Sequence, residues 1–313
     1  APMRALVARR FPGDLAGYDR FMAHSRSLCE KGFEELGDRP FGSVADMARV
    51  LPDLLRLEAW RSVHGLVARY VRDPRLRFAL SFHPLFVGGN PFTAPAIYAL
   101  IAHLERQWGV HYVMGGTGRL ASGLAGLVER QGGTLRFNAE VTRIRTSGPR
   151  ATGVELADGT VLPAKVVVSN ADAAWTHGKL LERSPRWSAS RLSRMRHSMS
   201  LFVWYFGTRV KYPQVPHHTI LLGPRYEGLV HDIFERQVLA DDFSLYLHRP
   251  TATDPSLAPE GCDAFYVLSP VPNLDGGALL DRRVDVDALV AESPAQIVLK
   301  PGNLVRCHDA LIR

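Results

Sequence analysis

The stretch that decides the fold reads His111-Tyr112-Val113-Met114-Gly115-Gly116-Thr117-Gly118. A short apolar run there, predicted to be a strand, meets glycines, which tolerate the positive φ angles of a tight turn. Beyond the turn Leu120, Leu124 and Leu127 recur at helical spacing, and Gly132 is placed to end that helix. We therefore predict a strand, a turn and a helix, an order typical of a nucleotide-binding α/β sheet.

More strands are predicted after this helix. Residues 134–141 read as a second strand, and residues 141–144, 151–156 and 161–168 suggest a small β-meander joined by tight turns. Together with the glycine turn, these strands predict part of a Rossmann-like domain.

Two other interpretations of the glycines stay open at this point. Gly116-x-Gly118-x-x-Ala121 fits the dinucleotide fingerprint, and Glu140 stands where the ribose-binding acid is expected, which would make the protein an NAD dehydrogenase. Short Gly-rich turns also precede ordinary packed helices, so a purely structural turn explains the same residues.

Composition limits the functions that the chain can have. Its 313 residues suggest one or two domains, and 46% hydrophobic residues allow a sizeable core. The net charge of +7 comes without a Lys/Arg block or a nucleic-acid motif, so we predict no nucleic-acid partner and a weak attraction to anionic lipid at most.

Cysteine and histidine spacing gives no metal signature. Cys29, Cys262 and Cys307 are isolated, which argues against a disulfide framework and fits a reducing compartment. His217-His218 is the one adjacent histidine pair, and no HExxH spacing occurs. We predict no metal site.

No segment reads as a signal peptide or a transmembrane helix. Residues 78–104 contain no Asp, Glu, Lys or Arg, but Pro84, Gly88, Gly89, Pro91 and Pro95 interrupt them. We predict a helix, an apolar loop and a helix there, with the loop either buried in a core or exposed as an apolar lip at a lipid surface or tunnel mouth.

The predicted elements change character along the chain. Residues 1–108 are mostly helical, 109–175 form the α/β portion, and 176–276 return to antiparallel strands at 200–207, 219–222, 243–247 and 264–268. The fold class is therefore α/β, α+β in part, with a partial Rossmann-like domain interleaved with a domain of antiparallel sheet plus helices.

Several longer motifs occur in a fixed order. They are Phe11-Pro12-Gly13-Asp14, Pro40-Phe41, Gly88-Gly89-Asn90-Pro91-Phe92, Gly115-Gly116-Thr117-Gly118, Ser169-Asn170-Ala171-Asp172, Leu201-Phe202-Val203, His217-His218-Thr219, Phe243-Ser244-Leu245-Tyr246 and Ala258-Pro259-Glu260-Gly261. In this order they resemble bacterial-type phytoene desaturase, a carotenoid-forming flavoprotein, over about residues 5–275.

The resemblance implies an FAD enzyme, an oxidoreductase acting on CH–CH groups, that desaturates phytoene in repeated rounds towards neurosporene or lycopene. It also implies a hydrocarbon carotenoid substrate and a peripheral position on the cytoplasmic membrane. A homo-oligomer is possible under the same resemblance. Related carotenoid isomerases, ketolases and oxygenases share the fold, so they remain alternatives.

The chain departs from the family pattern at both ends. The first residues already resemble a region downstream of the family's GxGxxG motif, and the resemblance ends near Gly276. Residues 277–313 look like a divergent tail that a frameshift would explain. We therefore expect a fragment that lacks FAD-binding segments, and a non-catalytic remnant is a further alternative.

The resemblance also assigns candidate residues. The glycine turn at 115–118 becomes a support for the FAD sheet rather than its pyrophosphate loop, which argues against Glu140 as a ribose ligand. The candidate cofactor-binding residues are Val141, Ser169, Asn170, Ala171 and Asp172.

Catalytic candidates lie in the helical part. Asp46 matches a carboxylate proposed to handle the proton, and Arg49 follows one helical turn later. Ser43-x-x-Asp46 also resembles a helix capping box, and both roles stay open. The candidate tunnel-lining residues are Phe82, Phe86, Phe92, Phe202, Trp204 and Phe206.

Overall fold

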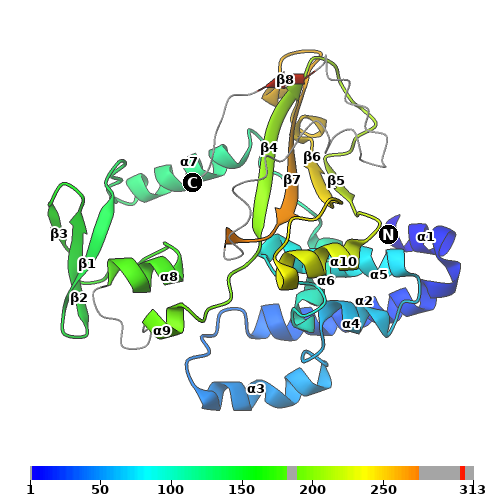
Figure 1. Ribbon diagram of the computed structural model, residues 1–313, viewed down its shortest axis with the longest axis horizontal. Coiled ribbons are helices and arrows are strands. Elements are labelled where there is room, and N and C mark those ends of the chain that lie inside the picture. The colour runs from blue at the N-terminus through cyan, green and yellow to red at the C-terminus, as the bar shows by residue number, and fades with distance from the viewer. Residues whose placement is uncertain (1, 182–188, 275–303, 307–313) are drawn as a thin grey trace. The chain divides into compact units, whose positions relative to one another are not determined.

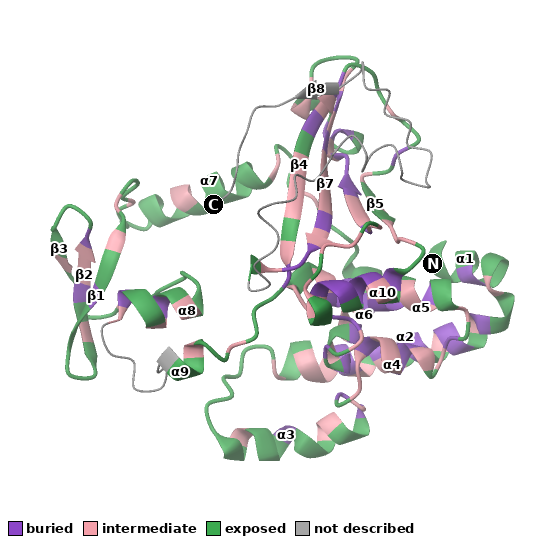
Figure 2. Cartoon of the chain, in the orientation of Figure 1, coloured by how far each residue is buried: buried purple, intermediate pink, exposed green. Residues whose placement is uncertain are grey.

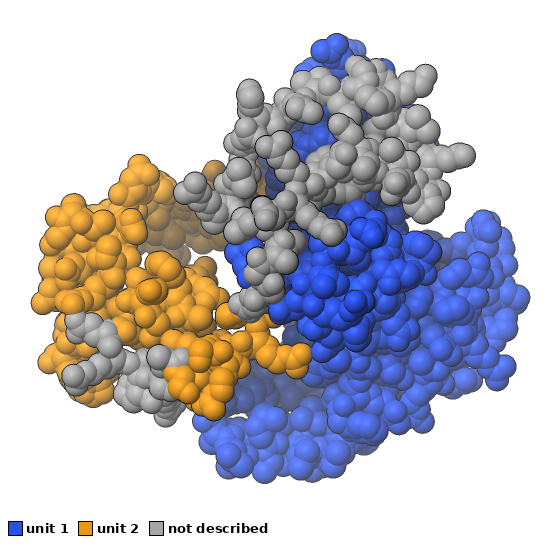
Figure 3. Space-filling view, in the orientation of Figure 1, with its two compact units in different colours: residues 1–116, 198–313 blue, residues 117–197 orange. Residues whose placement is uncertain are grey.

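The computed structural model describes residues 2–181, 189–274 and 304–306 (Figure 1). The chain divides into two compact units, one formed by residues 1–116 and 198–313 and the other by residues 117–197 (Figure 3). The first unit thus joins segments from both sides of the second. The predicted tail at 277–313 lies outside the described residues except for 304–306, as does Cys307.

Helices make up the N-terminal part of the first unit. They are α1 (Pro2–Arg10), α2 (Leu15–Cys29) with a π-helical extension (Glu30–Glu35), α3 (Val44–Arg56), α4 (Val63–Ala68), α5 (Pro74–Ser81) and α6 (Leu100–Trp108). Short 3₁₀ turns at Pro12–Asp14, His83–Val87 and Ala96–Ala99 connect some of them. The predicted helix, apolar loop and helix over 78–104 are therefore confirmed.

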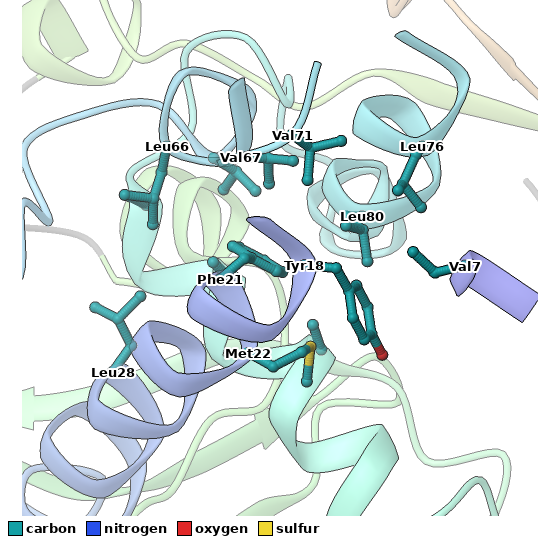
Figure 4. Packing of buried hydrophobic residues seen from close by; sticks show 14 of the residues in the cluster. Val7, Tyr18, Phe21, Met22, Leu28, Leu66, Val67, Val71, Leu76 and Leu80 are labelled. Carbon is teal, nitrogen blue, oxygen red and sulfur yellow. The ribbon is translucent and has the colours of Figure 1, made fainter. Parts of the chain in front are cut away.

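One hydrophobic core holds these helices together. Fully buried members of this core include Phe21 and Leu28 of α2, Leu66 and Val67 of α4, and Leu76 of α5 (Figure 4). Burying a side chain of this size stabilises a fold by about 1.5–3 kcal/mol. Figure 2 shows the buried residues concentrated in α2, α5 and the later helix α10 (Tyr226–His231).

A five-stranded sheet forms the rest of the first unit. Its strands follow the order β5 (His218–Leu221), β6 (Leu245–His248), β7 (Asp263–Val271), β4 (Ser200–Thr208) and β8 (Leu304–Arg306), and all four ladders are antiparallel. The strands predicted at 200–207, 219–222, 243–247 and 264–268 are confirmed to within a few residues. The long ladder between β4 and β7 pairs Ser200 with Val271 and continues to Thr208 with Asp263.

A buried ion pair supports the end of this sheet. Asp263 accepts hydrogen bonds from Arg249 (3.1 Å), the Thr251 hydroxyl (2.6 Å) and the backbone N–H of Tyr212 (2.7 Å). Burial alone would raise the pKa of Asp263, but the bonds from Thr251, Tyr212 and Arg249 outweigh it and lower the pKa. The carboxylate is therefore charged and fixed where the polypeptide enters β7.

The second unit is smaller and more open. It contains α7 (Thr117–Arg130), a three-stranded antiparallel sheet of β1 (Val141–Ser147), β2 (Arg150–Leu156) and β3 (Val161–Pro163), the short helix α8 (Ala173–Trp175) with a π-helical turn (Thr176–Leu180), and α9 (Ala189–Leu192). The predicted meander is confirmed in β1, β2 and the first part of β3. No residue of α7 is buried.

Three predicted strand segments are wrong. Residues 111–114, 134–140 and 164–168 lie in turns and irregular backbone. An extended segment becomes a strand only when a neighbour takes up successive backbone hydrogen bonds, and none of these segments belongs to a described sheet. Isolated bonds, from Ala157 N–H to Glu140 O and from Ala164 N–H to Thr152 O, do not build a ladder. Phe137 and Val168 are accordingly exposed by 79% and 89%. The α/β class holds, although every described strand pair is antiparallel.

Within the described ranges, no helix combines the length and the apolar character needed to cross a membrane.

Candidate functional site

An apolar cavity lies between the helical part and the sheet of the first unit. Its lining comes from the residue that caps α5 and the following 3₁₀ turn, from the segment before β4, and from β5, β6 and β7 with the residues that flank them. The lining residues are Phe82, Leu85, Phe86, Met199, Ile220, Leu222, Ser244, Leu245, Tyr246, Leu268 and Pro270. The cavity therefore joins segments from both halves of this unit.

The two hydroxyl groups in the lining are already engaged. The Ser244 hydroxyl accepts a 3.0 Å hydrogen bond from the backbone N–H of Gly223, and the Tyr246 hydroxyl bonds His218 at 2.6 Å. A ligand in this cavity is therefore offered apolar surface rather than an orienting polar group. Such a lining suits a hydrocarbon, which has no hydrogen bond to exchange.

Aromatic contacts join the helical wall to the strands. Phe82 and Phe86 meet edge to face at 5.4 Å between ring centroids, and Phe86 meets Tyr246 in the same manner at 6.0 Å. Phe86 is 58% exposed. The loop is therefore exposed at Phe86 rather than wholly buried, and its role as a lip at a tunnel mouth or lipid surface stays a prediction.

Strand alternation decides which sheet residues face this cavity. Ile220, Tyr246 and Leu268 stand opposite one another across β5, β6 and β7, so they share one face of the sheet. On β4 the residue paired with Leu268 is Val203. The cavity face of β4 therefore carries the odd-numbered positions.

Apart from Phe92, the predicted tunnel residues separate into two groups. Phe82 and Phe86 line the cavity. Phe202, Trp204 and Phe206 occupy the alternate positions of β4 and so share the opposite face, where Phe206 is buried and stacks on Phe265 at 5.1 Å. That face is packed by a core cluster of Phe206, Val215, Leu247 and Phe265.

Phe92 lies elsewhere in the helical part. It is half-buried and contacts His64, at 4.7 Å between ring centroids, and Tyr226, at 6.1 Å. Ser244, Tyr246 and Leu268 were not among the predicted lining residues. Side chains alternate between the two faces of a strand, so these three residues could have been predicted if the face that lines the cavity had been known.

Asp46 sits at the first turn of α3, where it forms a capping box. Its backbone N–H donates to the Ser43 hydroxyl at 3.2 Å, and its carboxylate accepts from the Ser43 backbone N–H at 3.0 Å. The bond from the Ser43 side chain lowers the pKa of Asp46, and Arg49, at 3.6 Å, acts in the same direction. The capping interpretation is confirmed, and Asp46 is a carboxylate at neutral pH.

The predicted cofactor residues all belong to the second unit. Val141 begins β1, and residues 169–172 form an exposed loop that leads into α8. The Ser169 hydroxyl bonds the Thr176 hydroxyl at 2.8 Å, and the Asp172 carboxylate accepts from the N–H of Ala174 at 2.8 Å. The π-helical turn after α8 packs against β1, so the loop and the strand are neighbours.

The glycine turn has a partner of its own. Gly115 and Gly116 adopt φ angles of +84° and +83°, as a tight turn before α7 requires. The N–H of Gly115 donates a 2.6 Å hydrogen bond to the Asp254 carboxylate. A carboxylate at this amide repels a phosphate, so the turn does not serve as a diphosphate cradle.

A search against protein families matches residues 9–261 to the flavin-containing amine oxidoreductases. The chain belongs to this family. Within the family, it is similar to the neurosporene-forming phytoene desaturase of Cereibacter sphaeroides, with 50% identity over 87% of this chain and 54% of that protein. It is 48% identical to the lycopene-forming phytoene desaturase of Pseudescherichia vulneris, over 90% of this chain and 56% of that protein.

These similarities confirm the resemblance drawn from the ordered motifs. The chain spans about half the length of the curated relatives that it matches. Among solved structures, an oxidoreductase from Methanosarcina mazei matches this member of the family with a TM-score of 0.56 and 19% identity, over 80% of this chain and 57% of that one. At that identity the match supports the fold alone.

Proposed function

We propose that the chain is part of an FAD-dependent phytoene desaturase of carotenoid biosynthesis. The observation that carries the proposal is the apolar cavity, whose Ser244 and Tyr246 hydroxyls are already hydrogen-bonded. The similarity to neurosporene- and lycopene-forming desaturases supports the same substrate class. A substrate without polar groups is selected by the shape and depth of such a surface.

The second unit fits one part of a flavin site. Loop 169–172 is exposed beside β1 and carries Asn170 and Ser169, whose hydroxyl bonds Thr176 and can still make a second hydrogen bond. These groups would hold the cofactor together with Val141. The glycine turn does not fit, because Asp254 already occupies the Gly115 N–H. We therefore assign the loop and β1, and not the turn, to cofactor contact.

Each round of desaturation breaks two C–H bonds of the substrate and forms one C=C bond. FAD, when bound, supplies the hydride acceptor that no amino-acid side chain can be. The chain's own residues orient the substrate and exclude water. Phe86 and Tyr246 lie against each other at the cavity and would fix the plane of an inserted polyene.

Asp46 is the proposed proton acceptor for the second hydrogen. Its lowered pKa keeps it in the carboxylate form, which can accept a proton but has none to donate. Arg49 would hold the charge of this group in place. Replacing Asp46 with Asn in the complete open reading frame should reduce desaturation about 100-fold or more. The control is Asp53→Asn in the same helix, and flavin content is measured on both proteins.

Membrane association is proposed for α3. Val44, Met47, Leu51 and Leu55 recur every three or four residues along one face of this helix and are 48–87% exposed. Arg49, 76% exposed, lies on the opposite, polar side of the helix. An exposed apolar stripe with basic residues on the polar face is typical of a helix that lies in the bilayer interface. Peripheral binding would give the cavity access to a substrate dissolved in lipid.

Vesicle sedimentation tests the role of α3. Anionic phospholipid vesicles should retain the protein, and Leu51→Glu with Leu55→Glu should lower the bound fraction severalfold. The matched control is Leu120→Glu with Leu124→Glu, which places the same charges on the similarly exposed α7. Equal losses in the two variants would remove α3 as the contact.

The reaction itself is tested by expressing the complete open reading frame in cells that accumulate phytoene. Mass and absorption spectra of the extracted carotenoids should show loss of pairs of hydrogens and longer conjugation. A product with added oxygen, or an isomer of the same mass, would assign a different reaction to the same fold. Unchanged phytoene beside a folded, flavin-loaded protein would contradict the proposal.

A further inference from the structure

Three imidazoles meet at the edge of the five-stranded sheet. His218 of β5 stands directly opposite His248 of β6, and His217 immediately precedes β5. The ring centroid of His217 lies 4.3 Å from that of His218 and 4.6 Å from that of His248. One nitrogen of each ring lies within 4.8 Å of one nitrogen of each of the others.

The same nitrogen of every ring is already anchored by a hydroxyl group. His217 Nδ1 bonds Thr253 Oγ1 at 2.5 Å, while His218 Nδ1 and His248 Nδ1 bond the Tyr246 hydroxyl at 2.6 Å and 3.0 Å. The Nε2 atoms are therefore the ones left to bind something else. His217 Nε2 is buried and has no hydrogen-bond partner.

This arrangement matches the support that metal-binding histidines receive. A histidine that coordinates through Nε2 carries its proton on Nδ1 and donates it to an oxygen atom, which fixes the orientation of the ring. His217 would donate to Thr253, and His218 and His248 would donate to the two lone pairs of the Tyr246 oxygen. Both bonds can form at once, because a phenolic oxygen accepts hydrogen bonds through its lone pairs and keeps its own O–H.

The electrostatic surroundings permit a cation. The positive charge of the Arg249 guanidinium is close enough to His217 to repel a second positive charge there. Its charge is balanced by Asp263 at 3.1 Å.

We propose that His217, His218 and His248 form a zinc site with three imidazole ligands and a fourth position open to water. Neutral imidazole is a good zinc ligand, and three protein ligands with one open position is a common zinc arrangement. Zn–N distances of about 2.1 Å require the three Nε2 atoms to approach one another more closely than 4.8 Å, the span within which one nitrogen of each ring lies, so the side chains would rotate on binding. The cation would tie the segment at β5 to β6, beside the cavity that Tyr246 lines.

The site is tested on the untagged protein of the complete open reading frame, stripped with a chelator and shown to be folded by circular dichroism. Zinc titration should give one tightly bound equivalent per chain, and Co²⁺ should give the intense visible absorption of a four-coordinate ion. A folded protein that binds neither ion at micromolar concentration overturns the proposal.

Variants separate this site from adventitious binding. His218→Gln changes the exposed ligand and should abolish stoichiometric binding, and His248→Gln should do the same. Tyr246→Phe keeps all three ligands but removes the hydroxyl that orients two of them, so zinc should bind about 10- to 100-fold more weakly. His231→Gln, at an exposed histidine of α10, should bind as the parent does. Unchanged affinity in His218→Gln or in Tyr246→Phe overturns the assignment.

Discussion

The carboxylate of Asp254 accepts a 2.6 Å hydrogen bond from the backbone N–H of Gly115, 139 residues earlier in the chain. Asp254 is buried, and its other oxygen accepts from the Ser256 hydroxyl at 2.6 Å. The glycine turn that most resembles a phosphate loop is therefore held by a negative charge. This contact argues against an NAD site at Gly116 and Gly118, in agreement with the flavin family to which the chain belongs.

Asp254→Ala should loosen this turn. Hydrogen exchange at the Gly115 amide should accelerate about two- to tenfold, the change expected for the loss of one hydrogen bond. The control is Ser256→Ala, which removes the other partner of Asp254 and leaves the bond to Gly115 in place. Equal exchange in the two variants would show that the carboxylate does not hold the turn.

Asp263→Asn should destabilise the first unit strongly. The change leaves the Arg249 guanidinium buried without its counter-charge, which costs about 3–5 kcal/mol in the free energy of unfolding. Denaturant unfolding measures the loss. Adding Arg249→Gln to the same protein should recover part of it, because the buried unpaired charge is then gone. A double variant as unstable as the single one would contradict this explanation.

The same carboxylate makes stability depend on acid pH. The pKa of Asp263 is lower in the folded protein than the ordinary value of about 3.9 in the unfolded chain. Its contribution is therefore present above pH about 4 and is lost as the pH falls through the folded-state pKa. The difference in unfolding free energy between the parent and Asp263→Asn should shrink below pH about 4. A difference that stays constant down to pH about 2 would contradict this sign.

Two glycine-to-alanine changes should act in opposite directions. A Cβ at Gly17 of α2 would lie only 1.9 Å from the Tyr70 carbonyl oxygen, so Gly17→Ala should cost about 1–3 kcal/mol or more. A Cβ at Gly123 of α7 meets nothing within 4 Å, so Gly123→Ala should stabilise that helix by about 0.5–1 kcal/mol. Thermal unfolding compares the two. A tolerated Gly17→Ala would show that α2 does not approach Tyr70 so closely.

Filling the cavity should impair the proposed reaction without affecting flavin content. Ile220→Trp adds bulk to the lining and should lower turnover of phytoene about tenfold or more, the size of effect expected from displacing a substrate. Val210→Trp is the control, because Val210 is similarly exposed and is not part of the lining. Comparable activity in the two variants would show that the substrate binds elsewhere.

The positions of the strands in the first unit could be predicted from the sequence, but the face of the sheet on which each side chain lies could not. The aromatic run at 200–207 has a large side chain at nearly every position, so the sequence showed no alternation. Register with β7 places Phe206 in a core against Phe265 and Val203 beside Leu268 on the cavity face. That distinction depends on the partner strand and on the layer that covers each face.

In the second unit, the predicted strands at 134–140 and 164–168 were wrong because no neighbouring strand forms a ladder with them. Residues 134–140 contain the strand-favouring Thr134 and Phe137, yet local preference alone does not form a backbone ladder. The histidine cluster was missed for a related reason. His217 and His218 form the pair visible in the sequence, and His248 joins them only through the β5–β6 ladder.

Anaerobic reduction of the bound flavin by phytoene tests the central claim most directly. The protein of the complete open reading frame is loaded with FAD and mixed with phytoene in vesicles while the absorption spectrum is recorded. The account predicts that flavin absorbance bleaches as a longer conjugated carotene appears, with one flavin reduced for each double bond formed. A spectrum of oxidised flavin that persists beside bound phytoene, or a product that forms without any bleaching, would contradict it.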